Sequence, residues 1–192
     1  TLPELPIQYK DYTVWQSGLA SNIIQQQEKF WLESFTGEIP KLNQPTDYPR
    51  PAVMNFQGAA FDITLSEALT GRLLRLAAQR KASLFMALLA GYNLLLARLT
   101  GAGAIIVGTP VSGRRLAGLE NIIGMFLNTL ALKNHPKPWQ SFLEFLEEVK
   151  QNTLQVFENQ DYPFETLLEK LNIPRDVSRN PLFDTLLNAV NE

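Results

Sequence analysis

A short, continuous apolar run is the feature that most constrains how this chain can fold. Residues 104–108 (AIIVG) carry no polar side chain, and a glycine-containing turn at 101–103 precedes them. A run of this length without alternation predicts a central strand that is buried on both faces. The preceding segment, residues 84–99, is apolar nearly all round and predicts a helix buried on several sides. A buried strand next to a buried helix favours layers of helix packed over a sheet.

The remaining pattern alternates between helical and extended segments. The predicted helices cover residues 21–35, the segment that Ser66 would cap, 84–99 with Ser83 as a second candidate cap, 140–157 and a segment that begins at Pro163. The predicted strands cover 61–65, 104–108, which Thr109-Pro110 would end, 129–133 and 182–190. This order predicts an α/β fold with α+β layering, in which helices cover the sheet. We expect residues 1–58 to be a loop-rich lead-in with one helix and residues 59–192 to be the sheet-and-helix core.

Composition narrows the class of protein. The chain has 192 residues, 45% of them hydrophobic, and a formal net charge of -2, which suits a single globular domain. The basic residues form no stripe or cluster, so we expect no nucleic-acid or membrane partner. Cysteine is absent and the first residues show no signal peptide, which is compatible with a reducing compartment, and we expect a cytoplasmic protein.

The candidate nucleophiles and bases are few. His135 is the only histidine, and its place between a predicted strand and a predicted helix favours a solvated loop residue over a general base. Ser112 lies in a sequence that superficially resembles a nucleophile elbow, but it lacks the preceding glycine, so a turn serine is the simpler interpretation. No spacing of His, Asp and Glu predicts a metal site.

The C-terminal third contains a polar run that local physics does not require. Pro163 fits the start of a helix because it has no backbone N–H to donate, and Asp161 could accept a bond from an amide at that end. Pro174 would end the helix. The run Arg175 to Asn180, ahead of Pro181, has no such local explanation.

Four segments together resemble the condensation domains of non-ribosomal peptide synthetases. They are residues 9–15 (YKDYTVW), 123–129 (IGMFLNT), 159–165 (NQDYPFE) and 175–182 (RDVSRNPL), in the order that the family has them. Thr13 and Leu127 stand where the family usually has Ala and Val. The catalytic His-His-x-x-x-Asp-Gly motif of the family, which precedes the first of these segments, has no counterpart in a chain with one histidine.

The resemblance implies a fold and a role. It implies a lobe similar to chloramphenicol acetyltransferase, with a mixed sheet, forming one half of a V around a channel. The chain, residues 1–192, would be a partial C-terminal, acceptor-side half of a peptide-bond-forming acyltransferase of antibiotic or secondary-metabolite biosynthesis, most similar to the subclass that joins two L-residues. The parent domain would be an enzyme, and we expect this chain alone to be inactive because the catalytic histidines lie outside it.

The resemblance also assigns residues. Asn128, Ser112 and Gly113 would border the channel on the acceptor side, although Asn128 could equally cap a turn or satisfy backbone groups. The residues expected to be structural are Tyr9, Asp11, Trp15, Asp161, Pro163, Arg175, Asp176, Arg179 and Asn180. Of these, Asp11, Arg175, Asp176 and Arg179 would form buried or half-buried pairs that fix loops.

The implied partners are other parts of a synthetase. They are the N-terminal lobe of the domain, the upstream and downstream carrier proteins, and an adjacent adenylation domain. No cofactor would bind directly, since the substrates are carried on the phosphopantetheine of the carriers. Two alternatives stay open: a non-catalytic module that docks carrier or synthetase domains, and an epimerisation-type domain of the same superfamily. Uncovered apolar surface could also make the fragment self-associate.

Overall fold

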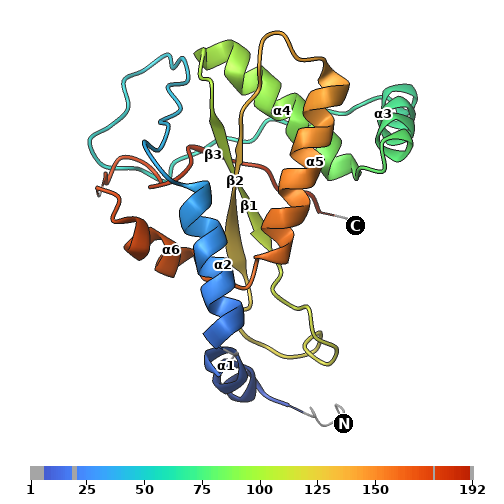
Figure 1. The fold of residues 1–192 in the computed structure, drawn as a ribbon. Helices are drawn as coiled ribbons and strands as arrows, with labels where there is room; N and C mark the ends of the chain where they lie inside the picture. The colour runs from blue at the N-terminus through green and yellow to red at the C-terminus, as the bar shows by residue number, and fades with distance from the viewer. Residues whose placement is uncertain (1–6, 19–20, 175, 191–192) are drawn as a thin grey trace.

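A three-stranded mixed sheet lies at the centre of the molecule (Figure 1). The computed structural model describes residues 7–18, 21–174 and 176–190. Strand β1 (Ile105–Val111) pairs antiparallel with β2 (Asn128–Asn134) and parallel with β3 (Thr185–Leu186), which gives the order β2-β1-β3. The prediction of a mixed sheet covered by helices is confirmed.

Six helices surround this sheet in the described ranges. They are α1 (Tyr9–Ser17), α2 (Ser21–Ser34), α3 (Glu67–Gln79), α4 (Leu84–Thr100), α5 (Phe142–Glu158) and α6 (Phe164–Leu171). The predicted caps form at two of them, where the Ser66 and Ser83 hydroxyls accept hydrogen bonds from the amides of Leu69 and Met86. Helix α5 packs on both α4 and β2, so the buried helix and the buried strands share one core.

The core joins the lead-in to the sheet. Ile105, Val107 and Leu146 are fully buried, and Trp31 of α2 and Phe35, just after it, belong to the same cluster. The segment 1–58 therefore contributes to the main core, and its described residues contain two helices where the sequence predicted one. The second helix, α1, went unpredicted because it is short and buries none of its residues.

The end of β1 differs from the prediction. We expected Thr109-Pro110 to end the strand, but β1 continues to Val111. Gly108 accepts a hydrogen bond from the amide of Leu187, so Pro110, two residues on, faces the same side of the strand. Because β3 ends at Leu186, no strand on that side needs the N–H that proline lacks.

Two predicted strands were wrong in part or in whole. Residues 61–65 are exposed coil without a partner strand in the described chain, and only Thr185–Leu186 of the predicted strand 182–190 pairs with the sheet. In both cases the apolar pattern is real, but a strand also needs a neighbour to receive its backbone hydrogen bonds.

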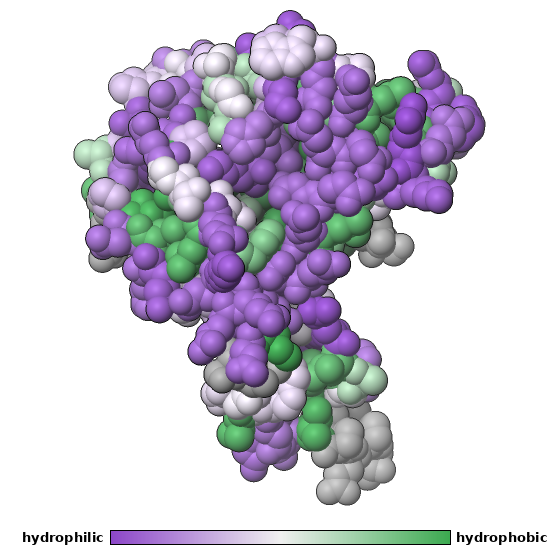
Figure 2. All heavy atoms as spheres, viewed as in Figure 1, coloured by the Kyte–Doolittle hydropathy of each residue, from purple (hydrophilic) through white to green (hydrophobic). Residues whose placement is uncertain are grey.

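The outer surface is mostly hydrophilic on the face shown in Figure 2, with separate apolar patches that include one around α1 and the loop between β1 and β2. In the described ranges no single helix is long and apolar enough to cross a membrane. Helices α3 and α4 reach that length and composition only when counted together, and they meet at a bend of 104°.

The close approach of Phe183 to β1 gives a test of the core. A Cβ added at Gly108 would lie 2.5 Å from the Phe183 ring, which is itself buried. We expect Gly108→Ala to lower the free energy of unfolding by about 1–3 kcal/mol in denaturant titrations, because the ring has to move. Gly91→Ala is the matched control: it lies on an exposed face of α4 with open space around it, and we expect a gain of about 0.5–1 kcal/mol. Equal effects of the two variants would contradict this packing.

Candidate functional site

Three of the four sequence motifs meet at one cavity of about 230 Å³. We call it the junction cavity, and its lining residues are Tyr12, Gln16, Gly113, Met125, Phe126, Leu127, Asn128, Gln160, Asp161, Pro163 and Glu165. These residues come from α1, from the loop between β1 and β2, from the start of β2, and from the α5–α6 connection. Segments more than 100 residues apart in sequence thus form one wall.

Asn128 forms four hydrogen bonds with the backbone at this junction. Its Nδ2 donates to the carbonyls of Gln160, at 2.8 Å, and Tyr162, at 2.9 Å. Its Oδ1 accepts from the amides of Thr129, at 2.9 Å, and Phe164, at 3.2 Å. The amide group is therefore fully used in holding backbone, which is the interpretation of Asn128 that needs no channel.

The same side chain caps α6. We predicted that Asp161 would accept a hydrogen bond from an amide at the start of this helix. That prediction was wrong: the amide of Phe164 donates to Asn128, which is 36 residues away in sequence. A distant cap of this kind satisfies an orphan amide and at the same time fixes α6 against β2. Pro163 occupies the N-cap position and has no side-chain cap of its own.

Asp161 instead links three segments by its charge. Its Oδ2 accepts from Arg115 Nη1 at 2.9 Å and from Gln27 Nε2 at 3.2 Å. This connects the α5–α6 connection to the β1–β2 loop and to α2. Sequence reasoning missed both Arg115 and Gln27, because neither lies in a motif and nothing in a loop or a helix face signals a partner so far along the chain.

An aromatic cluster of Tyr9, Tyr12 and Phe126 lies where α1 meets the loop between β1 and β2. The Tyr9 ring meets Phe126 edge-on with ring centres 5.1 Å apart, and Tyr12 meets Phe126 at 4.6 Å. The Tyr9 hydroxyl donates to the Met125 carbonyl at 2.7 Å. An added Cβ at Gly124 would collide with the Tyr9 ring, so a glycine is required where α1 meets this loop. The first motif (residues 9–15) and the second motif (residues 123–129) thus pack directly against each other.

The loop after β1 is held closely against Phe126. Gly113 has a φ of 65°, and a Cβ there would collide with the Phe126 carbonyl oxygen. The Arg114 guanidinium lies over the Phe126 ring, 4.1 Å from its centre, and donates to the Leu119 carbonyl. Gly113 lines the cavity, whereas Ser112 is exposed and is not among the lining residues.

One tyrosine in the cavity lining has a shifted pKa. Burial, and after it the Asp161 and Tyr9 charges, raise the pKa of the Tyr12 phenol, so it stays protonated at neutral pH. Two carboxylates, Asp161 and Glu165, line the cavity with no imidazole among them. A lining without an imidazole is suited to shape and position a bound group.

His135 lies elsewhere, beside a different cavity of about 280 Å³. Partial burial, and then the charges of Lys133 and Lys137, lower the pKa of its imidazole below the ordinary value. No group of three His, Cys, Asp or Glu residues that could hold a metal was found within the described ranges.

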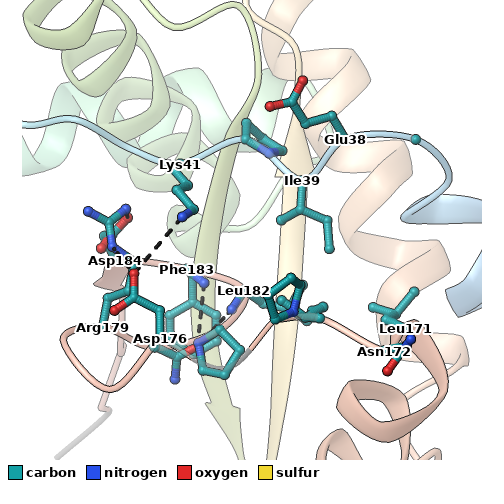
Figure 3. A pocket seen from close by; sticks show the side chains of 16 residues that line it. Glu38, Ile39, Lys41, Leu171, Asn172, Asp176, Arg179, Leu182, Phe183 and Asp184 are labelled. Atoms are coloured by element: carbon teal, nitrogen blue, oxygen red, sulfur yellow. Dashed lines mark hydrogen bonds and ion pairs between the residues drawn. The ribbon is translucent and has the colours of Figure 1, made fainter.

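The fourth motif lines a separate groove of about 310 Å³, which we call the 176–184 groove (Figure 3). Arg179 Nε lies 3.6 Å from Asp176, and its Nη1 lies 3.4 Å from Asp184. Asn180 accepts hydrogen bonds from the amides of Leu182 and Phe183, which closes a turn. Asp176 and Arg179 thus hold their own loop, and Arg175 lies outside the described residues.

Two expected structural residues of the first motif have more local roles. Asp11 is exposed and accepts from the amide of Gln8 at 2.8 Å, so it caps α1 and does not form the half-buried pair that we expected. Trp15 is largely exposed, with its ring 5.7 Å from that of Tyr12.

Comparison with known proteins identifies the family. A family model described as "Condensation domain" matches residues 1–192. The chain belongs to the condensation-domain family. It is 52% identical to a segment of tyrocidine synthase 2 from Brevibacillus parabrevis and 52% identical to a segment of gramicidin S synthase 2 from Aneurinibacillus migulanus. The alignments cover 100% and 99% of this condensation-domain chain but only 5% and 4% of the two synthases.

Solved structures agree on the fold. A four-domain nonribosomal peptide synthetase bound to AMP and glycine is 28% identical, with a TM-score of 0.84 over 90% of this chain and 13% of its own. The X-domain from teicoplanin biosynthesis, solved in complex with OxyB, has a TM-score of 0.89 over 97% of this chain and 42% of its own, at 24% identity. The second likeness shows the fold alone.

The hydrogen bonds of Asn128 predict a large effect on stability. Asn128→Ala leaves two carbonyls and two amides without this partner, so we expect the free energy of unfolding to fall by about 2–3 kcal/mol in denaturant titrations. Asn128→Asp keeps the acceptor but faces two carbonyls with a carboxylate, and we expect a loss of similar size. The exposed Asn121→Ala is the control, with a change within about 0.5 kcal/mol. If the free energy of unfolding fell no more for the Asn128 variants than for Asn121→Ala, the stabilising role of these four hydrogen bonds would be contradicted.

The lowered pKa of His135 predicts how stability changes with pH. As the pH falls, the His135 imidazole of the unfolded chain takes up a proton near its ordinary pKa of 6.5, whereas the imidazole of the folded chain takes it up only at a lower pH. Stability should therefore fall as the pH drops from about 7.5 to about 5.5, a window in which few other side chains titrate. We expect His135→Gln to reduce this slope in urea titrations at a series of pH values. A slope unchanged by the substitution would assign the pH dependence to other groups.

Proposed function

We propose that this chain forms the acceptor-side half of a peptide-bond-forming condensation domain. Its role is to form one wall of the channel in which the two substrates react. In that channel an amine on one carrier protein attacks a thioester on another, and each substrate is tethered by phosphopantetheine. The convergence of three family motifs on the junction cavity is the observation that carries this proposal. The cavity contains Asn128 and Gly113, the residues that the family resemblance places beside the channel.

The contacts at the cavity support positioning in place of proton transfer. Asn128 uses all of its donors and acceptors on backbone groups, so it shapes the wall and has no free donor for a reacting atom. No imidazole lines the cavity. The catalytic histidine would come from the N-terminal lobe, and holding two tethered substrates close together supplies much of the rate effect.

The surface next to the cavity suits contact with that missing lobe. Ile123, Met125 and Leu127 project outward from one extended stretch, with exposed fractions of 94%, 71% and 61%. An apolar strip of this kind next to a substrate cavity is typical of an interface that closes over the site.

Filling the cavity tests the proposal without disturbing the fold. Leu127 lines the cavity but is mostly exposed in the 192-residue chain, so Leu127→Trp should leave the melting temperature of that chain unchanged, and coupling is then measured in the complete condensation domain. We expect it to slow amide formation between carrier-loaded substrates at least about 10-fold, because the added ring displaces the acceptor from its aligned position.

Two controls sharpen this experiment. Leu127→Val restores the residue that the family usually has, and we expect normal coupling. Leu154→Trp adds the same ring at an exposed position of α5 that does not line the cavity, and we expect no effect on coupling. Normal coupling by Leu127→Trp would contradict a channel role for the cavity, and a loss equal to that of Leu154→Trp would reveal a non-specific effect.

A further inference from the structure

The cavity beside His135 has no part in the proposed function. We call it the β2-end cavity: it has a volume of about 280 Å³ and lies between α2, the last residues of β2 and α5. Helices α2 and α5 flank β2 in the view of Figure 1. Trp31 and Phe145 in its lining are 2% and 1% exposed, and polar side chains complete the lining. Apolar walls with a few polar groups are typical of a site for a small ligand.

Asn134 brings an unsatisfied donor to this cavity. Its side chain lines the cavity, the residue is 5% exposed, and its Nδ2 has no hydrogen-bond partner among the described residues. A buried amide of this kind normally has a partner, so a group that accepts from Asn134 is missing.

The orientation of the Asn134 amide is fixed by Asn152. The Nδ2 of Asn152 donates to the Lys133 carbonyl at 2.9 Å, which identifies it as the nitrogen, and also to Asn134 Oδ1 at 3.0 Å. If the Asn134 amide were turned over, two N–H donors would face each other. The free group of Asn134 is therefore the donor Nδ2, and the missing partner is an acceptor.

Lys133 brings a positive charge that no carboxylate compensates. Its half-buried ammonium donates to the Ser34 carbonyl at 3.2 Å and lies 5.7 Å from the centre of the Phe35 ring. Within the described ranges this ammonium forms no ion pair, and two of its three N–H groups remain for another acceptor.

The one carboxylate in the lining is already neutralised. Glu148 accepts from Lys137 Nζ at 3.4 Å and from Gln140 Nε2 at 2.6 Å. After burial, the charges of Lys133 and Lys137 lower the pKa of the neighbouring His135 imidazole, and Glu148 raises it by less. The charges around this cavity thus favour an anion over a cation.

These features together select one kind of ligand. The Asn134 amide requires an acceptor oxygen, the Lys133 ammonium requires a negative charge, and the rings of Trp31 and Phe145 favour an apolar body. A carboxylate on an apolar group meets all three requirements, because its oxygens accept charge-assisted hydrogen bonds.

We propose that the β2-end cavity binds a carboxylate group on an apolar body, with Asn134 Nδ2 and Lys133 Nζ as the donors. The carboxylate belongs either to a free small acid or to an acidic side chain of the surrounding polypeptide, and the recognition chemistry is the same for both. The cavity shares no lining residue with the junction cavity, which lies at the other end of β2, so the proposal is independent of the channel role.

Calorimetric titration of the 192-residue chain with 3-phenylpropionate tests the proposal. We expect a Kd of about 1 mM or tighter, and at least about 10-fold weaker binding of 3-phenylpropanamide, which has the same body without the charge. In NMR spectra the indole N–H of Trp31 should shift and that of the exposed Trp139 should not. Equal binding of acid and amide, or no binding of the acid, would overturn the proposal.

Substitutions at Lys133 show whether its charge holds the acid. Lys133→Met keeps the length of the side chain without the charge, and we expect binding to weaken at least about 10-fold, whereas Lys133→Arg should stay within about 3-fold. Lys10→Met, on the exposed face of α1, makes the same change in net charge and should have no effect. Equal weakening by Lys133→Met and Lys10→Met would contradict a specific site.

The same titration of the complete condensation domain identifies the source of the carboxylate. Binding of the acid by both proteins would assign the site to a free small acid. Binding by the 192-residue chain alone would show that an acidic side chain of the complete domain occupies the cavity. None of these measurements involves catalysis, so their failure is distinct from a failure of the proposed function.

Discussion

The four hydrogen bonds of the Asn128 side chain are the interaction on which the candidate site depends. They join the first residue of β2 to the carbonyls of the α5–α6 connection and to the first amide of α6. A strand, a connection and a helix are thus fixed by one amide group. Because the carboxamide offers two donors and two lone-pair acceptors, asparagine matches this set of backbone partners and aspartate does not.

The other contacts of the junction cavity add to the four hydrogen bonds of Asn128, and each of them is weaker. The Arg115–Asp161 pair is partly exposed, with side-chain exposed fractions of 50% and 36%, so solvent screens it and its contribution is at most about 1 kcal/mol. The aromatic contacts of Tyr9 and Tyr12 with Phe126 fix α1 against the β1–β2 loop. Together these contacts give a rigid wall, and a rigid wall is what the alignment of two tethered substrates requires.

The sequence predicted the elements whose information is local. The cap residues Ser66 and Ser83, the buried helix α4 and the centre of β1 all follow from spacing and polarity. The errors arose where the outcome depends on a distant partner. Asn128 caps α6 across 36 residues, Asp161 bonds Arg115 and Gln27, and residues 61–65 lack a neighbouring strand in the described chain. The family motifs did not indicate that three of them meet in one cavity while the fourth lines a separate groove.

The central claim is that these residues position substrates while proton transfer depends on a histidine supplied by the rest of the domain. A single-turnover assay with carrier proteins loaded with donor and acceptor aminoacyl groups tests it most directly. We expect amide product from the complete condensation domain and none above background from the purified 192-residue chain under the same conditions. Amide formation by the 192-residue chain alone, at a rate near that of the complete domain, would contradict the account.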